Sequence, residues 1–123
     1  MALVAPVLFT LVFGSIEFGR AMMVSNTVTT AAREGARKGV LPNGTSSEIQ
    51  TAVTDVLTAS SVPTTHATIT ILVDGAAADA STATTGKPIS VTVSVPYADV
   101  TWLPTPIFLS SAQLSGRAVM RRE

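Results

Sequence analysis

The chain has 123 residues and no net formal charge, and it is 46% hydrophobic but only 13% charged. Its mean hydropathy of +0.45 is high for an ordinary soluble domain, and its length is too short for a protein with many membrane spans. Without excess positive charge, nucleic acid is not an expected partner. The absence of cysteine excludes disulfides, thiolate nucleophiles and cysteine metal sites. We therefore expect one small domain and a membrane anchor.

The first sixteen residues, MALVAPVLFTLVFGSI, form an apolar run without a charged side chain. As a helix this run is about 24 Å long at ~1.5 Å per residue, whereas a bilayer core requires about 20 residues. The apolar character continues past Glu17 and Arg20 through the sequence AMMV at residues 21–24. The pattern predicts a membrane-anchoring helix.

A cleaved signal peptide is the alternative interpretation of this run. Signal peptides have a basic region before the apolar segment and a small-residue cleavage site after it. Neither feature accompanies the run, and the helical pattern continues through it. A secreted domain after leader removal is therefore the alternative to an anchored chain.

Residues 22–39 continue the helix as an amphipathic segment. One face consists of small apolar residues, which allow another element to approach the backbone closely: Val24, Val28, Ala31, Ala32, Gly35, Ala36 and Gly39. Pro42 then prevents the helix from continuing. We divide the chain into an anchor and spine helix at residues 1–40 and a small extracytoplasmic α+β domain at residues 41–123.

A short second helix is predicted after the turn at Pro42. The sequence Thr45-Ser46-Ser47-Glu48 has the spacing of a capping box. Apolar residues then recur at helical steps from residue 49, and the helix is expected to end near Ser60.

The period changes from 3.6 to two in residues 68–73, 89–95 and 113–122, which is typical of strands with one buried face. Residues 74–87, between the first two strands, are rich in small polar residues and predict a mobile hairpin loop. The expected fold class is α+β, with a three- to four-stranded antiparallel sheet.

Residues 97–109, YADVTWLPTPIFL, combine aromatic residues with two prolines, so a long regular element is not expected. Two interpretations are open. The stretch either covers the sheet and completes the core, or it exposes a partner-binding surface that includes Trp102, Ile107 and Phe108.

Glu17 and Arg20 are three residues apart, share a helix face and can form an ion pair. A charged residue beside a membrane span is costly and usually has a partner. The pair either sets the register of helix packing, within one chain or between subunits, or is solvated at the membrane interface.

Two pairs of small residues have the four-residue spacing that permits close helix packing. For Ser15 and Gly19 we expect contacts between subunits. For Gly35 and Gly39 we expect packing of the helix onto the chain's own sheet, with contacts between subunits as the alternative.

The charged face of Arg33, Glu34, Arg37 and Lys38 also has two interpretations. We expect it to be solvated, as most charged helix faces are. The alternative is contact with acidic lipid headgroups or with a neighbouring subunit.

The sequence lacks the ingredients of a catalytic site. His66 is the only histidine, and there is no phosphate-binding glycine loop. The acidic residues are scattered, and Asp74, Asp79 and Asp99 lack EF-hand spacing. We expect His66 to lie on the surface at a strand start, and we expect no enzyme activity, no metal or other cofactor, and no small-molecule substrate.

The string FGSIEFGRAMMVSNTVTTAAREGARKGV resembles the N-terminal signature of the TadE-like proteins of the tight-adherence (Flp) pilus system. In that family an apolar run with a proline leads to a glycine, then to E-F-G-R, and later to A-A-R-E-G-A-R. The matching residues here are Pro6, Gly14, the segment 17–20 and the segment 31–37. The ending LSGRAVMRR, residues 114–122, is similar to the last strand of the family.

The resemblance implies a minor pilin or pseudopilin with a pilin-like fold, a structural component in the assembly of tight-adherence (type IVb/Flp) pili or of a related secretion system. It implies a single-pass protein of the bacterial inner membrane with its C-terminal domain in the periplasm or outside the cell. The implied partners are inner-membrane lipid and other pilus or pseudopilin subunits, contacted through the N-terminal helix. The alternative function is a membrane-tethered extracytoplasmic binding module.

The family is similar to type IV prepilins, which have a basic leader, a glycine cleavage site and a glutamate five residues into the mature chain. All three would lie before Met1, and a prepilin peptidase is an implied partner if such a leader exists upstream. The lysines and arginines of the chain follow the apolar run, which the positive-inside rule interprets as N-terminus out. A basic leader would reverse that orientation.

Overall fold

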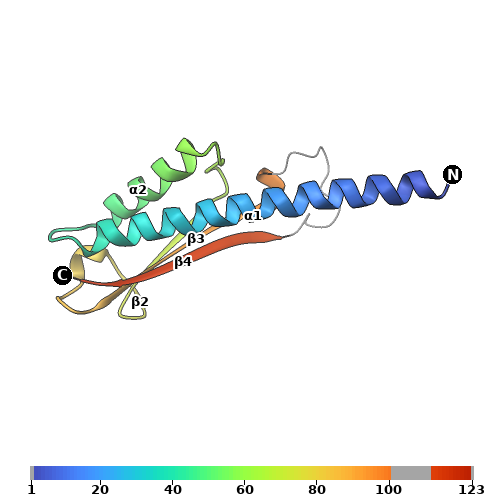
Figure 1. Ribbon diagram of the computed structural model, residues 1–123. Coiled ribbons are helices and arrows are strands. Elements are labelled where there is room, and N and C mark those ends of the chain that lie inside the picture. Colours follow the sequence, from blue (N-terminus) through green and yellow to red (C-terminus); the bar gives the residue numbers. More distant parts are fainter. Residues whose placement is uncertain (1, 101–111, 123) are drawn as a thin grey trace.

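The computed structural model describes residues 2–100 and 112–122 of the chain (Figure 1). Within them a long helix lies between a short helix and a four-stranded sheet, which confirms the α+β fold class. The helices are α1 (Val4–Val40) and α2 (Ser46–Ala59), the strands are β1 (Thr68–Val73), β2 (Ala76–Ala77), β3 (Pro88–Pro96) and β4 (Gln113–Arg121), and the 3-10 turns are η1 (Ala80–Thr82) and η2 (Tyr97–Asp99).

A single continuous helix, α1, runs for 37 residues, or about 55 Å at ~1.5 Å per residue. Pro6 lies in its first turn, where a backbone N–H has no helical partner to lose, so the proline does not break the helix. At the other end, Leu41 has an extended backbone, as expected for a residue before Pro42. The predicted end near Gly39 is confirmed to within one residue.

The exposure of α1 changes at Gly14. Residues 4–13 are exposed, and the blue N-terminal end of the helix extends beyond the rest of the chain (Figure 1). From Gly14 onward, buried residues recur at alternating steps of three and four, the spacing of one continuous helix face. This buried stripe contains Gly14, Glu17, Ala21, Val24, Val28, Ala31 and Gly35. One helix therefore has an exposed apolar segment followed by a segment that forms the core.

The short helix α2 begins with the predicted capping box. Thr45 Oγ1 accepts a hydrogen bond from the Glu48 backbone N–H at 3.2 Å, and Glu48 Oε2 accepts one from the Thr45 backbone N–H at 3.1 Å. Both bonds satisfy N–H groups that have no helical partner in the first turn. The residues that α2 buries are Ile49, Ala52, Val53 and Leu57.

The sheet has the strand order β2-β1-β3-β4, and all neighbouring strands are antiparallel. β3 therefore lies in the middle, and its apolar side chains are fully buried: Ile89, Val91, Val93 and Val95. Pro88 and Pro96 are the first and last residues of this strand. β4 is the outer strand next to it, with its open edge free of a further strand among the described residues.

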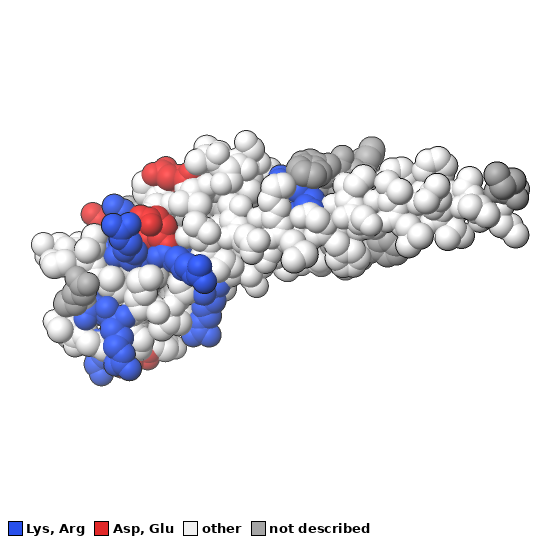
Figure 2. Space-filling model, in the orientation of Figure 1, with Lys and Arg blue, Asp and Glu red and all other residues white. Residues whose placement is uncertain are grey.

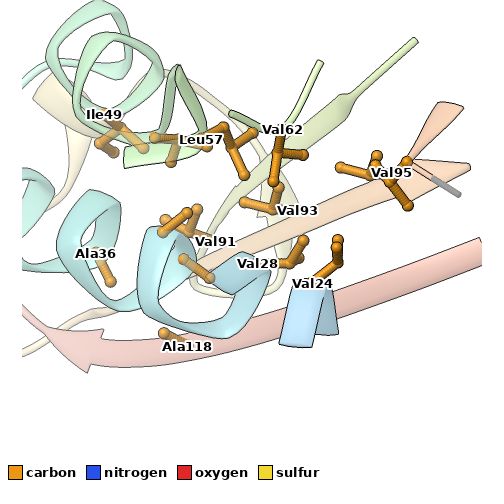
Figure 3. Close-up of a cluster of buried hydrophobic side chains, with 14 of the residues drawn as sticks. Val24, Val28, Ala36, Ile49, Leu57, Val62, Val91, Val93, Val95 and Ala118 are labelled. Carbon is orange, nitrogen blue, oxygen red and sulfur yellow. The ribbon is translucent and has the colours of Figure 1, made fainter. Parts of the chain in front are cut away.

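The core lies where α1 passes between α2 and the sheet (Figure 3). Val24 and Val28 of α1 face the valines of β3, and Leu57 of α2 closes the core on the other side. β4 approaches α1 most closely at Gly116, where an added Cβ would lie 2.6 Å from the Cα of Thr29. A glycine is required at this point because any side chain would meet backbone atoms. We call the described residues from Gly14 to Arg122 the head.

The connection between β1 and β3 differs from the mobile hairpin loop predicted from its composition. It contains β2 and η1, and Ala80 is fully buried. Arg122 fixes it from the other end of the chain, because its Nη1 lies 2.8, 3.3 and 3.1 Å from the carbonyl oxygens of Gly39, Gly44 and Ala80. Contacts between distant residues thus order a loop whose local sequence gives no sign of order.

Candidate functional site

The exposed segment of α1 presents an apolar surface. From Val4 to Met23 the helix is about 30 Å long at ~1.5 Å per residue, which matches the hydrocarbon thickness of about 30 Å of a bilayer. Among the described residues, only α1 is long and apolar enough to cross a membrane. The large apolar side chains exposed on its first 20 residues and on the preceding Leu3 are Leu3, Val4, Val7, Leu8, Phe9, Leu11, Val12, Phe13, Ile16, Phe18, Met22 and Met23.

A cluster of four residues joins the head to α1 where this apolar segment meets the buried stripe. The Tyr97 hydroxyl donates a hydrogen bond to the Glu17 backbone carbonyl at 3.2 Å, and both residues are fully buried. One turn further along α1, Arg20 Nε donates to the Val100 carbonyl at 2.8 Å. We call Glu17, Arg20, Tyr97 and Val100 the junction cluster. It fixes η2 and the following residue to the helix at this level.

The burial of Glu17 requires that its carboxyl group be satisfied, since an unpartnered buried charge costs several kcal/mol. All buried side-chain nitrogen and oxygen atoms among the described residues have a hydrogen-bond partner. Arg20 Nε donates to the Val100 carbonyl, and Glu17 and Arg20 each have a further partner, so their pairing with one another stays a prediction. The ion pairs found among the described residues join Glu34 to Arg37 and Asp74 to Lys87, and His66 is in hydrogen-bond contact with Asp99.

Sequence reasoning missed Tyr97 and Val100 as partners of α1. Both residues lie eighty positions away from the helix residues that they contact. The available signal was a tyrosine two residues beyond the predicted strand at 89–95, since a buried tyrosine usually needs a partner for its hydroxyl.

His66 lies on the surface before β1, and its Nδ1 is 2.8 Å from Asp99 Oδ2. Asp99 is adjacent to Val100, so this contact connects the segment between α2 and β1 to the junction cluster. Exposed polar contacts of this kind contribute little to stability, and this one acts as a further contact between segments.

The three aspartates that could have formed a calcium site have separate roles. Asp74 pairs with Lys87, Asp79 accepts hydrogen bonds at η1, and Asp99 contacts His66. The Ser81 backbone N–H, then the Ser81 hydroxyl and the Ser46 N–H, lower the pKa of Asp79. Within residues 2–100 and 112–122, no three histidine or acidic side chains lie close enough to hold a metal ion.

The two pairs of small residues on α1 have different surroundings. Ser15 and Gly19 are exposed, and a Cβ added to Gly19 would meet nothing within 4 Å. Gly35 and Gly39 are buried, and a Cβ at these positions would lie 2.7 Å from Val53 and 2.6 Å from Ile49. The second pair thus packs within the chain, chiefly against α2, and at Gly39 also against Ile89 of β3, which would lie 3.6 Å from an added Cβ.

The charged face of α1 is exposed at Arg33, Arg37 and Lys38, and Glu34 lies 3.5 Å from Arg37. The possible partner surface of Trp102, Ile107 and Phe108 lies outside the described residues.

One comparison with known proteins gave a match. The family model described as TadE-like protein matches residues 1–37, which confirms the resemblance over this part of the chain. The matched residues are most of α1 and include Glu17 and Arg20 of the junction cluster. No curated protein and no solved structure matches the chain.

Proposed function

We propose that this protein is a minor pilin or pseudopilin of a tight-adherence pilus or of a related secretion system. It is a structural subunit of the bacterial inner membrane without enzymatic activity, and its head lies in the periplasm or outside the cell. Its partners are membrane lipid and other pilus subunits that pack against α1. The match of residues 1–37 to the TadE-like family model supports this assignment.

The observation that carries the proposal is the continuity of α1 through the change in exposure at Gly14. The helix is exposed and apolar before this residue, and its buried stripe forms the core after it. A helix without a break transmits position and orientation, so the head is held at a fixed angle to the anchor. This arrangement suits a subunit that must be placed in a regular assembly.

The same continuity argues against removal of the apolar segment as a leader. Glu17, Ala21 and Val24 lie within the apolar region and are buried in the head. Cleavage after Val24 would remove these residues from the core and would expose the face of β3 that they cover. The anchored form is therefore the form in which the head is complete.

Ser15 and Gly19 provide the surface for helix packing between subunits. They lie at the start of the head, on a side of α1 that no described residue covers. Small residues at this spacing let two helix backbones approach closely inside a membrane. A neighbouring subunit can thus pack there without displacing the head.

Membrane attachment is tested with the double variant Leu8→Arg/Val12→Arg of the full chain. Each arginine at the centre of a span costs about 2.5–3.5 kcal/mol of insertion free energy, so the variant should leave the membrane fraction in carbonate extraction and flotation. The matched control is Thr68→Arg/Thr70→Arg, because both threonines are exposed on β1. A wild-type chain that is a soluble monomer without detergent would refute the proposal.

Assembly is tested by co-purification from detergent with other pilus subunits. We expect Gly19→Leu to reduce co-purification several-fold while the chain stays in the membrane fraction, because a large side chain blocks close helix approach. Thr70→Leu is the control on the head. Loss of pilus formation in a strain without the protein should be reversed by the wild-type chain and not by Gly19→Leu.

A further inference from the structure

Four exposed arginines follow one border of the head. Arg33 and Arg37 lie on α1, and Arg117 and Arg121 lie on β4. We call these four residues the basic strip. Figure 2 shows lysine and arginine side chains gathered over this end of the molecule, away from the N-terminal segment.

Packing of β4 on α1 places the two halves of the basic strip at the same edge of the head, with Arg117 and Arg121 projecting from the sheet face away from α1. Gly116 lies against Thr29, and Arg122 binds the carbonyl of Gly39. β4 therefore runs beside α1 in the same direction, and residues 117–121 lie next to residues 30–38. The open edge of β4 lies along the strip.

A cleft of about 390 Å³ lies at the opposite side of α1, between its last turn and α2. Its charged residues are Lys38, Glu48 and Asp55, so it has a net negative charge. Asp55 is exposed and forms none of the ion pairs among the described residues. We call this hollow the acidic cleft.

The basic strip and the acidic cleft lie at the same distance from the anchor. Ile49 contacts Gly35 and Gly39, and Val53 contacts Gly35. The segment 48–55 of α2 is therefore level with the segment 33–39 of α1. Two copies with their anchors parallel in one membrane would present a strip and a cleft at the same height.

The spacing of the charges also agrees. Glu48 and Asp55 are seven helical residues apart, or about 10 Å at ~1.5 Å per residue. Arg117 and Arg121 are four strand residues apart, or about 13 Å at ~3.3 Å per residue. Side chains as long as arginine easily cover the difference.

We propose that the basic strip of one subunit docks into the acidic cleft of the next copy of the same chain. This inference rests on the proposed function, since it supplies the contact between heads in an assembly whose anchors pack in the membrane. The chain has no net charge, so the positive charge of the strip is balanced on other surfaces of the same molecule. Charge complementarity sets register and suppresses wrong partners.

Because the strip and the cleft are different surfaces, the contact is heterologous. Such a contact does not close after two copies, and its repetition produces a ring or an open filament. Every added subunit leaves one strip and one cleft free, so the head alone specifies a direction of growth.

Acidic lipid headgroups are the less suitable occupant of the strip. Arg33 lies ten residues beyond Met23, the end of the apolar span, or about 15 Å along α1 at ~1.5 Å per residue. When residues 4–23 span the membrane, the strip is thus about two Debye lengths from the surface at physiological salt, where the field of the membrane is largely screened.

The test uses disulfide formation between two differently tagged full-length chains in membranes. The chain has no cysteine of its own. Val119→Cys lies on β4 within the strip, and Thr51→Cys lies in the cleft, so neither variant removes a charge. With copper phenanthroline as oxidant, a mixture of the two chains should form a heterodimer that carries both tags. Thr70→Cys, exposed on β1, replaces Val119→Cys in the control mixture and should crosslink several-fold less.

Charge reversal shows whether the arginines hold the contact. Adding Arg33→Glu and Arg37→Glu to the Val119→Cys chain should lower the heterodimer yield about fivefold, as expected for the loss of a few exposed ion pairs. Adding Asp55→Arg to the Thr51→Cys chain should then restore much of the yield. Equal yields for strip and control cysteines, or a yield unchanged by reversal, would overturn the docking.

The outcomes separate this inference from the proposed function. A chain that stays in the membrane fraction but fails to crosslink through the strip refutes the docking. It does not contradict the proposed function as an anchored pilus subunit. A wild-type chain recovered as a soluble monomer refutes both.

Discussion

The hydroxyl of Tyr97 reaches across eighty residues of sequence and donates a hydrogen bond to the backbone carbonyl of Glu17. The bond lies at the level where α1 leaves the exposed apolar segment and enters the head. Together with the contact from Arg20 to the Val100 carbonyl, it attaches η2, at the end of β3, to the helix at the start of the head.

Tyr97→Phe should lower the free energy of unfolding by about 1 kcal/mol, because the buried carbonyl of Glu17 loses a donor while the ring still fills its place. The measurement is thermal unfolding of the full chain in detergent, followed by circular dichroism. Thr70→Val, an exposed change of similar chemistry, is the control. An unchanged midpoint in Tyr97→Phe would show that the hydrogen bond contributes nothing.

Substitution of alanine for two glycines on different surfaces should change the stability of the protein in opposite directions. Gly116→Ala brings a Cβ to 2.6 Å from the Cα of Thr29 and should cost about 1–3 kcal/mol. Gly19→Ala meets nothing within 4 Å and should stabilise the helix by about 0.5–1 kcal/mol. Chemical unfolding in detergent measures both, and the prediction fails if the two changes have the same sign.

Thr45→Ala should destabilise the head by about 1 kcal/mol, because it removes the acceptor for the Glu48 N–H at the start of α2. Thr45→Ser retains the hydroxyl and should remain close to wild type. Comparison of the two thermal midpoints isolates the capping bond. Equal losses in both variants would mean that the methyl group, and not the hydroxyl, matters.

Asp79 should make stability depend on pH in the acidic range. Its pKa is lowered by hydrogen bonds from Ser81 and Ser46, so its contribution is present above the ordinary aspartate pKa of about 3.9. The contribution is lost as the pH falls below this value through the lowered pKa. Between pH 5 and pH 3 the wild type should therefore lose more stability than Asp79→Asn, as measured by thermal midpoints. Parallel losses in the two proteins would contradict this prediction.

Local sequence patterns predicted the elements of the fold well. The end of α1, the capping box at Thr45 and Glu48, and the strands at 68–73 and 89–95 depend on residues near one another in the chain. Periodicity and capping express the geometry of single helices and strands. The ordered connection at residues 74–87 was missed because Arg122 fixes it from the far end of the sequence.

The sequence by itself determined that one apolar helix would be long enough to span a membrane, and it indicated which residues of that helix would form a stripe. Only the tertiary structure decided which neighbour each residue meets: α2 at Gly35 and Gly39, solvent or another subunit at Gly19, and η2 at Glu17. The physical reason is that the period of a helix fixes the direction of a side chain, whereas the packing of distant segments fixes what lies there.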